Sequence, residues 1–276
     1  MVNHVERNEA QDNQDVRQRR GFGVEGALDQ AIIQELAAAA EDAGYHTFWV
    51  NDEAHGDGLL ALREAAAVTT MIRLGVGVIP LDRQGPERIA ARVQELALPV
   101  ERLTVGVGSG HAAGGLARVR TSVAALRIST EATLVVAAIG PRMLSLAGEI
   151  ADGVLLDWPP PVYVKDAAEI VSQGAAEAGR PRPWIGGYVF TAVGSAGIAK
   201  LHSEADHYAA IPSYAAHFAR IGAEPMDAVA HGDDAAALGR SLPPFETVLD
   251  ETVVRAVVAK ETAASYIDVL LAAAPR

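Results

Sequence analysis

Short apolar runs, many rich in β-branched residues, alternate with Ala-rich amphipathic stretches along most of this 276-residue chain. After a first run at 21–24, the spacing predicts a helix with Asp29 as its N-cap residue and Gly44 as its stop. Further runs predict strands at 47–50, 74–79, 103–107, 134–139, 154–156, 185–193 and 267–271. Strands that alternate with helices and carry few polar residues are typical of a parallel sheet covered by helices.

Eight such units in one chain favour closure of the sheet into a (β/α)8 TIM barrel, with an open doubly wound sheet as the alternative. A long helical tract that contains Pro212 and Pro225 precedes the last predicted strand, so we interpret it as a helical insertion after strand seven. The segment 1–20 is almost entirely polar and has no apolar core of a signal peptide. We therefore expect a disordered N-terminal extension over 1–20 and a single barrel domain over 21–276.

The charge balance excludes some classes of partner. The chain carries 23 Lys and Arg against 35 Asp and Glu, a formal net charge of −12, which argues against general binding to nucleic acid. It has no cysteine, which excludes disulfides, thiolate catalysis and Cys-ligated metals. No apolar run approaches the roughly 20 residues that span a bilayer, so we expect a cytoplasmic protein with no membrane contact. His202 and His207 do not share a helix face, and we expect no metal site.

Small residues follow two of the predicted strands at the end where barrel enzymes hold their active sites. The run Gly106-Val107-Gly108-Ser109-Gly110 lacks the third glycine of a dinucleotide fingerprint, because His111 stands in its place. It is either a tight turn or a loop whose backbone N–H groups approach an anion. Gly140-Pro141 opens the helix after strand five and is a second candidate anion seat.

Ionisable and aromatic residues follow two other strands. Asp52, Glu53 and His55 come directly after strand two, where they act in proton transfer or serve as caps and solvated loop residues. Trp158 follows strand six, where it packs against a planar ligand or only covers the barrel mouth.

Taken in order, five segments resemble the luciferase-like monooxygenase family of flavin- and deazaflavin-dependent oxidoreductases. They are 43–52, 72–80, 103–108, 140–156 and 214–222. The resemblance covers nearly all of the chain after the polar extension. It implies a luciferase-like barrel with trimmed loops and an isoalloxazine-type ring bound at its C-terminal mouth.

The resemblance also implies positions for the cofactor. A bulge in strand three, with a cis non-proline peptide at Gly77-Val78, would lie behind the ring. The phosphate would be held by backbone at Gly108-Ser109, next to Gly110, and at Gly140-Pro141. Asp52 would lie near the ring, and Glu53 stands where several members have histidine.

The resemblance leaves three functional hypotheses. The first is an oxidoreductase that transfers hydride between coenzyme F420 and an unidentified small organic substrate, with Asp52, Glu53 or His55 handling the proton. The second is an FMN-dependent monooxygenase, and the third is a non-catalytic flavin-binding barrel. Because the third strand is Gly-rich and 214–222 resembles the deazaflavin members, we predict that F420 binds more tightly than FMN. The family often dimerises, so a homodimer is compatible with the resemblance.

Overall fold

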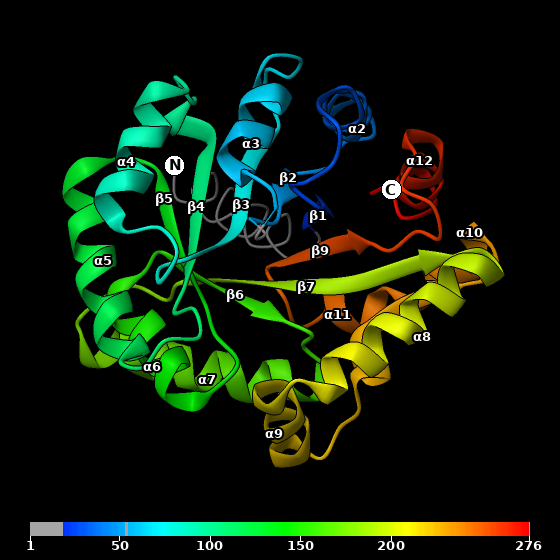
Figure 1. The fold of residues 1–276 in the computed structure, drawn as a ribbon. Helices are drawn as coiled ribbons and strands as arrows, with labels where there is room; N and C mark the ends of the chain where they lie inside the picture. Colours follow the sequence, from blue (N-terminus) through cyan, green and yellow to red (C-terminus); the bar gives the residue numbers. More distant parts are fainter. Residues whose placement is uncertain (1–18, 53–54, 276) are drawn as a thin grey trace, which may run out of the picture.

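The computed structural model describes residues 19–52 and 55–275, over which strands alternate with helices around a barrel (Figure 1). The strands are β1 (Arg19–Val24), β2 (Thr47–Val50), β3 (Arg73–Pro80), β4 (Leu103–Gly108), β5 (Thr133–Ala137), β6 (Gly153–Asp157), β7 (Trp184–Val193), β8 (Val229–Gly232) and β9 (Glu251–Ala256). The α-helices are α2 (Gln30–Asp42), α3 (Gly58–Ala66), α4 (Pro86–Glu95), α5 (Gly115–Ser129), α6 (Pro141–Ile150), α7 (Pro161–Glu177), α8 (Gly194–Ala210), α9 (Pro212–Ile221), α10 (Ala235–Ser241), α11 (Pro243–Glu246) and α12 (Ala263–Ala272). Two 3-10 turns, η2 (Val100–Arg102) and η3 (Pro225–Ala228), precede β4 and β8.

Eight of the described strands close into a parallel barrel. Pairing runs from β1 through β6 in sequence order, then from β6 to β7, from β7 to β9 and from β9 back to β1. Strand β8 pairs with the C-terminal half of β7, where Phe190 lies opposite Val229, and stands outside the ring. The predicted closed barrel is confirmed, and the open doubly wound sheet is not formed.

Side chains alternate between the inside of the barrel and the surface that the helices cover, as a closed pleated sheet requires. The inward set forms one cluster that includes Trp49, Val135, Leu155, Tyr188 and Val253. The large rings fit because glycines stand at other inward positions. A Cβ on Gly75 would lie 2.4 Å from Cε3 of Trp49, and one on Gly186 would lie 2.1 Å from the ring of Trp184. In the N-terminal half of the barrel interior, aromatic rings therefore pack against glycine backbone.

The predicted strand at 267–271 is wrong, because these residues belong to α12. Tyr266, Val269 and Leu270 are buried at helical spacing, whereas Leu271 is 63% exposed. Thr262 caps this helix by accepting a hydrogen bond from the Ser265 N–H at 3.3 Å. The last barrel strand is β9 instead, whose two charged residues hide its apolar pattern in the sequence although all six positions are buried.

The first strand begins at Arg19, two residues before the expected domain start at 21. Arg20 is held there by Glu246, 2.5 Å from its Nε, and by the carbonyl of Ala273, 2.8 Å from its Nη1. The rest of the predicted extension, 1–18, lies outside the described residues. Asp29 caps α2 as predicted, with its side chain accepting from the Ala31 N–H at 2.9 Å.

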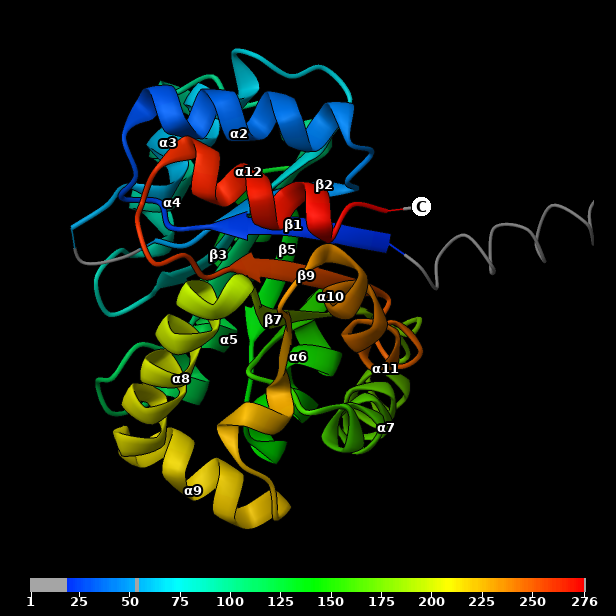
Figure 2. The ribbon, with the colours of Figure 1, turned by 90° about the vertical axis from the view of Figure 1, so that its right-hand side faces the viewer.

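The expected helical insertion after strand seven is present as α8 and α9. Figure 2 shows both helices at the end of the barrel to which β1 and β9 point, and the chain's C-terminus at the opposite end. In the part of the chain that the structure describes, no helix combines the length and the apolar character needed to cross a membrane.

Candidate active site

A cavity of about 620 Å³ opens at the C-terminal ends of the barrel strands. One arc of its wall comes from β3, β4 and β5 and consists mainly of backbone and small side chains, among them Gly77, Val78, Gly108, Ser109, Gly110, Ala137 and Ala138. The next arc comes from β6, β7 and the insertion and carries carboxyl and hydroxyl groups, among them Asp157, Tyr188, Tyr208, Ser213 and Tyr214. The cavity has the size of a small-molecule or cofactor site and lies where barrel enzymes hold theirs.

Strand β3 supplies a flat part of the first arc. The peptide bond between Gly77 and Val78 is cis, and the β3–β4 register shifts between Val76 and Ile79, as the family resemblance implied. A Cβ on Gly77 would lie 2.5 Å from the hydroxyl of Tyr188, so only glycine fits at this position. The backbone of β3 therefore packs directly on the second arc and leaves Val78 on the cavity lining.

Backbone N–H groups of the loop after β4 bind a carboxylate of the protein itself, that of Asp82. Gly108, Ser109 and Gly110 line the cavity. The carboxylate of Asp82 accepts hydrogen bonds from the backbone N–H groups of His111, at 2.7 Å, and Ala112, at 3.1 Å. Slight burial acts in the opposite direction, but these amide hydrogen bonds lower the pKa of Asp82. Sequence reasoning missed this contact, because Asp82 belongs to the connection after β3.

The second candidate anion seat is open. Gly140 is the N-cap residue of α6 and Pro141 its first residue. Neither is among the described lining residues, but Ile139, directly before them, is. A Cβ on Gly140 would meet no described atom within 4 Å. Arg220 of α9 donates to the carbonyl of Ile139 at 2.7 Å, which brings a guanidinium close to the first turn of α6.

Of the three residues expected to handle a proton, the structure places one at the cavity. Asp52 lines it but is 5% exposed, and its carboxylate accepts from the Gly58 N–H at 2.8 Å and pairs with Arg83. These contacts tie the end of β2 to α3 and to the connection after β3. His55 is exposed and is not part of the described lining, and Glu53 lies outside the described residues.

The carboxyl group that sequence reasoning did not single out is Asp157, the last residue of β6. The hydroxyl of Tyr214, from α9, donates a hydrogen bond to its Oδ2. Burial raises the pKa of Asp157 to about 6, and the Tyr214 hydrogen bond and the charge of Arg255 oppose that rise. The ring of Tyr208 packs edge-on against Tyr214, with centroids 4.9 Å apart, and holds the phenol in place.

Trp158, the next residue, does not face the cavity as expected. It is fully buried, and its ring stacks on Phe190 at 4.1 Å between centroids and packs against Tyr208 at 4.9 Å. Trp158 lies just beyond the end of β6 and has a positive φ of 48°, and this local turn directs its ring onto Phe190 and Tyr208. Trp158 therefore supports the wall from behind and is not a ligand-contacting residue of this cavity.

Known proteins share this architecture. The chain is 26% identical to 5,10-methylenetetrahydromethanopterin reductase of Archaeoglobus fulgidus over 199 residues, 58% of this chain and 60% of that one. It is also 25% identical to a second such reductase, from Methanolobus tindarius, over 58% of this chain and 60% of that one. An F420-dependent secondary alcohol dehydrogenase, solved with an F420-acetone adduct, has the same fold, with a TM-score of 0.74 at 16% identity that covers 92% of this chain and 97% of that one.

An FMN-containing protein shares the fold as well. The oxygenating constituent of 3,6-diketocamphane monooxygenase from Pseudomonas putida, solved with FMN, matches with a TM-score of 0.69 at 14% identity, over 93% of this chain and 97% of that one. The sequence profile of the luciferase-like monooxygenases matches residues 16–120 and 120–270, which is nearly the whole chain. On this evidence the chain belongs to the luciferase-like monooxygenase family.

Proposed function

We propose that this chain is an oxidoreductase that transfers hydride between the deazaflavin coenzyme F420 and a small organic substrate. The observation that carries the proposal is the division of the cavity wall, with backbone and small side chains on β3–β5 and an ionisable pair, Asp157 and Tyr214, on the next arc. A flat tricyclic ring needs the first surface, and a substrate that gains or loses hydride needs the second. The name of the F420-dependent secondary alcohol dehydrogenase that shares this fold supports the choice of coenzyme.

The residues present fit such a cofactor. A Cβ on Gly108 would lie 2.9 Å from Cγ2 of Val78, so the absence of a side chain at Gly108 leaves room for Val78 on the cavity wall. Val78 and Ala137 would contact the ring. We place the phosphate at the start of α6, near Gly140 and Arg220, because Asp82 already fills the loop after β4. When bound, the coenzyme supplies a ring carbon that accepts or gives hydride.

Asp157 is the group that we propose to move the proton. When an alcohol is oxidised, hydride leaves its carbon for the coenzyme and the hydroxyl proton must go to a base; reduction of a carbonyl reverses both transfers. A carboxyl that titrates near pH 6 can accept and return that proton near neutrality. Tyr214 holds the carboxylate by a hydrogen bond and fixes its orientation.

An FMN-dependent monooxygenase is the second candidate function, and the similarity to the FMN-bound camphane enzyme favours it. Both cofactors present a tricyclic ring and a phosphate, so the first arc of the cavity would accept either.

Titration of the purified chain with F420 and with FMN, followed by ring fluorescence, tests the proposal. We expect tighter binding of F420 and turnover that needs no oxygen. Tighter binding of FMN with oxygen-dependent turnover would favour the monooxygenase. A folded chain that binds neither cofactor would contradict both functions and leave the non-catalytic barrel.

A further inference from the structure

A second cavity, of about 310 Å³, lies at the N-terminal mouth of the barrel, opposite the candidate active site. Its lining consists largely of the first inward-facing residues of the strands: Arg19 on β1, Arg73 on β3, Thr104 on β4, Thr133 on β5 and Glu251 on β9. With Thr47 on β2, six strands thus place polar side chains in one ring at this mouth.

Aromatic rings separate this cavity from the candidate active site. The rings of Trp49 and Trp184 stack, with centroids 6.0 Å apart and planes 15° apart, and both line the lower cavity. Tyr188, which lines the upper cavity, contacts the ring of Trp49 edge-on at 6.2 Å. A ligand in the lower cavity therefore would not touch a ligand in the upper one.

Among the described residues, two guanidinium groups in the lower cavity, those of Arg19 and Arg73, make few hydrogen bonds. Arg73 uses one nitrogen, Nη2, to reach the hydroxyls of Thr133, at 3.2 Å, and Thr104, at 3.4 Å. The ion pairs found among residues 19–52 and 55–275 involve neither Arg19 nor Arg73.

The nearby carboxyl groups are engaged with other donors. Glu251 accepts hydrogen bonds from Nε1 of Trp49, at 3.0 Å, and from the hydroxyl of Thr47, at 3.3 Å. Glu41, in the adjoining depression of about 420 Å³, accepts from the backbone N–H groups of Met71 and Ile72, both at 2.7 Å. Neither carboxyl group is within ion-pair distance of the two arginines, but Glu251 shares the cavity with them, and the charges of Arg19 and Arg73 oppose the rise in its pKa that burial causes.

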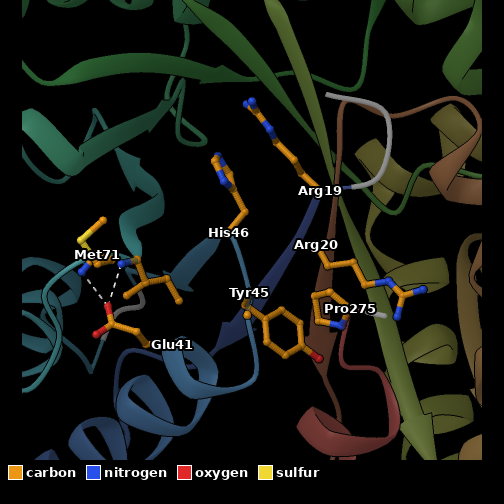
Figure 3. Close-up of a pocket in the computed structure, with 9 residues that line it drawn as sticks. Arg19, Arg20, Glu41, Tyr45, His46, Met71 and Pro275 are labelled. Atoms are coloured by element: carbon orange, nitrogen blue, oxygen red, sulfur yellow. Dashed lines mark hydrogen bonds between the residues drawn. The ribbon is translucent and has the colours of Figure 1, made fainter. Parts of the chain in front are cut away.

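His46 stands between the two cations and lines both depressions. Figure 3 shows the side chains of Arg19 and His46 extending to the same side, with Arg20 turned away from them. Burial, together with the charges of Arg19 and Arg73, lowers the pKa of His46 to about 4. His46 is therefore neutral near pH 7, and its titration reports the charge of whatever lies between the arginines.

We propose that the N-terminal mouth of the barrel binds a phosphate group between Arg19 and Arg73, with the hydroxyls of Thr104 and Thr133 beside it. Guanidinium groups match the oxygens of phosphate with two parallel hydrogen bonds, and two of them neutralise its charge. Among residues 19–52 and 55–275 no carboxylate forms an ion pair with either arginine, and this favours an external anion between them even in a chain with a formal net charge of −12. The phosphate belongs to free inorganic phosphate or to a small phosphomonoester, since both present the same oxygens and the cavity admits either.

The test is a ¹H NMR titration of His46 in the full-length chain, with and without inorganic phosphate, against chloride at the same ionic strength. The His46→Gln variant identifies the resonance. An anion within about 4–6 Å favours the protonated ring, so we expect phosphate to raise the pKa of His46 by about 1 unit or more. Arg73→Gln should weaken phosphate binding by about tenfold or more, since it removes charge-assisted hydrogen bonds.

The control is Arg63→Gln, which changes an arginine on α3 that is 58% exposed in its side chain and pairs with Glu64; it should bind phosphate like the parent chain. Arg73→Lys keeps the charge and should retain part of the binding, which separates loss of the site from loss of the fold. Glycerol 3-phosphate, titrated in parallel, identifies the source, because tighter binding than inorganic phosphate indicates an ester. The proposal is overturned if neither ligand shifts His46, if chloride shifts it equally, or if Arg73→Gln keeps the full shift.

Discussion

The hydroxyl of Tyr214 donates a hydrogen bond to the carboxylate of Asp157, and the two residues come from α9 and from the end of β6. Both line the cavity at the C-terminal mouth of the barrel. The helical insertion therefore adds a phenol hydrogen bond to a carboxyl group at the end of a barrel strand. This pair is the basis of the first two predictions.

Replacement of Asp157 by Asn should lower turnover with F420 by about 10²–10⁴-fold and leave the affinity for the cofactor nearly unchanged, because the amide cannot accept a proton. Glu53→Gln, measured in parallel, tests the residue expected from the family resemblance. Equal turnover of Asp157→Asn and the parent chain would refute the role of Asp157, and a large loss in Glu53→Gln would transfer that role to Glu53.

Tyr214→Phe should shift the acidic limb of the pH–rate profile to higher pH, because the hydrogen bond from Tyr214 lowers the pKa of Asp157. The profile of turnover against pH, recorded from pH 5 to 8, measures the shift. An unshifted profile would mean that the Tyr214 contact does not control the proton of Asp157.

Asp157 should also make the stability of the fold depend on pH. Burial raises its folded-state pKa from 3.8 to about 6, so the fold favours the protonated carboxyl group. The stability that this preference contributes is complete below about pH 4 and is lost as the pH rises through about 6, in total about 3 kcal/mol. Urea unfolding at pH 4 and pH 7 should therefore show that Asp157→Asn gains stability over the parent chain at the higher pH. A difference that does not change with pH would contradict the assignment.

Gly140→Val should weaken the binding of F420 and of FMN alike without unfolding the chain, since a side chain there meets no described atom and would extend into the proposed phosphate seat. The matched control is Gly85→Val, at the N-cap of α4, which also precedes a proline at the first helical position. Fluorescence titration of both variants compares the affinities. Parent-like affinity in Gly140→Val would place the phosphate elsewhere.

Ala137→Leu tests the cavity itself, because Ala137 faces it from β5 and a larger side chain would occupy the space of the ring. We expect the affinity for either cofactor to fall by about tenfold or more, which corresponds to a loss of at least about 1.4 kcal/mol of binding free energy. Ala176→Leu, at an exposed position of α7, is the control and should bind normally. Loss of affinity in both variants would point to a general effect on folding.

The pattern of the amino-acid sequence was sufficient for the closed barrel, for the Asp29 cap and for the small residues that line the cavity at 108–110. These features depend on local preferences, since apolar periodicity reports burial and glycine reports a close approach of backbone. The family resemblance added the cis peptide between Gly77 and Val78, which periodicity alone does not predict.

Other features depended on which distant segments the barrel brings together. Strand β9 was missed because it carries Glu251 and Arg255, which are buried with partners distant in the sequence: Thr47 and Trp49 donate to Glu251, and Glu25 pairs with Arg255. The apolar run at 267–271 packs as a helix instead. Asp82 fills the loop after β4, and Tyr214 meets Asp157, only after the sheet has closed and the insertion has folded over its mouth. A sequence pattern reports whether a side chain is buried, but the partner of a buried ionisable group is decided by the tertiary structure, because desolvation is offset only by groups that the fold brings within hydrogen-bond distance.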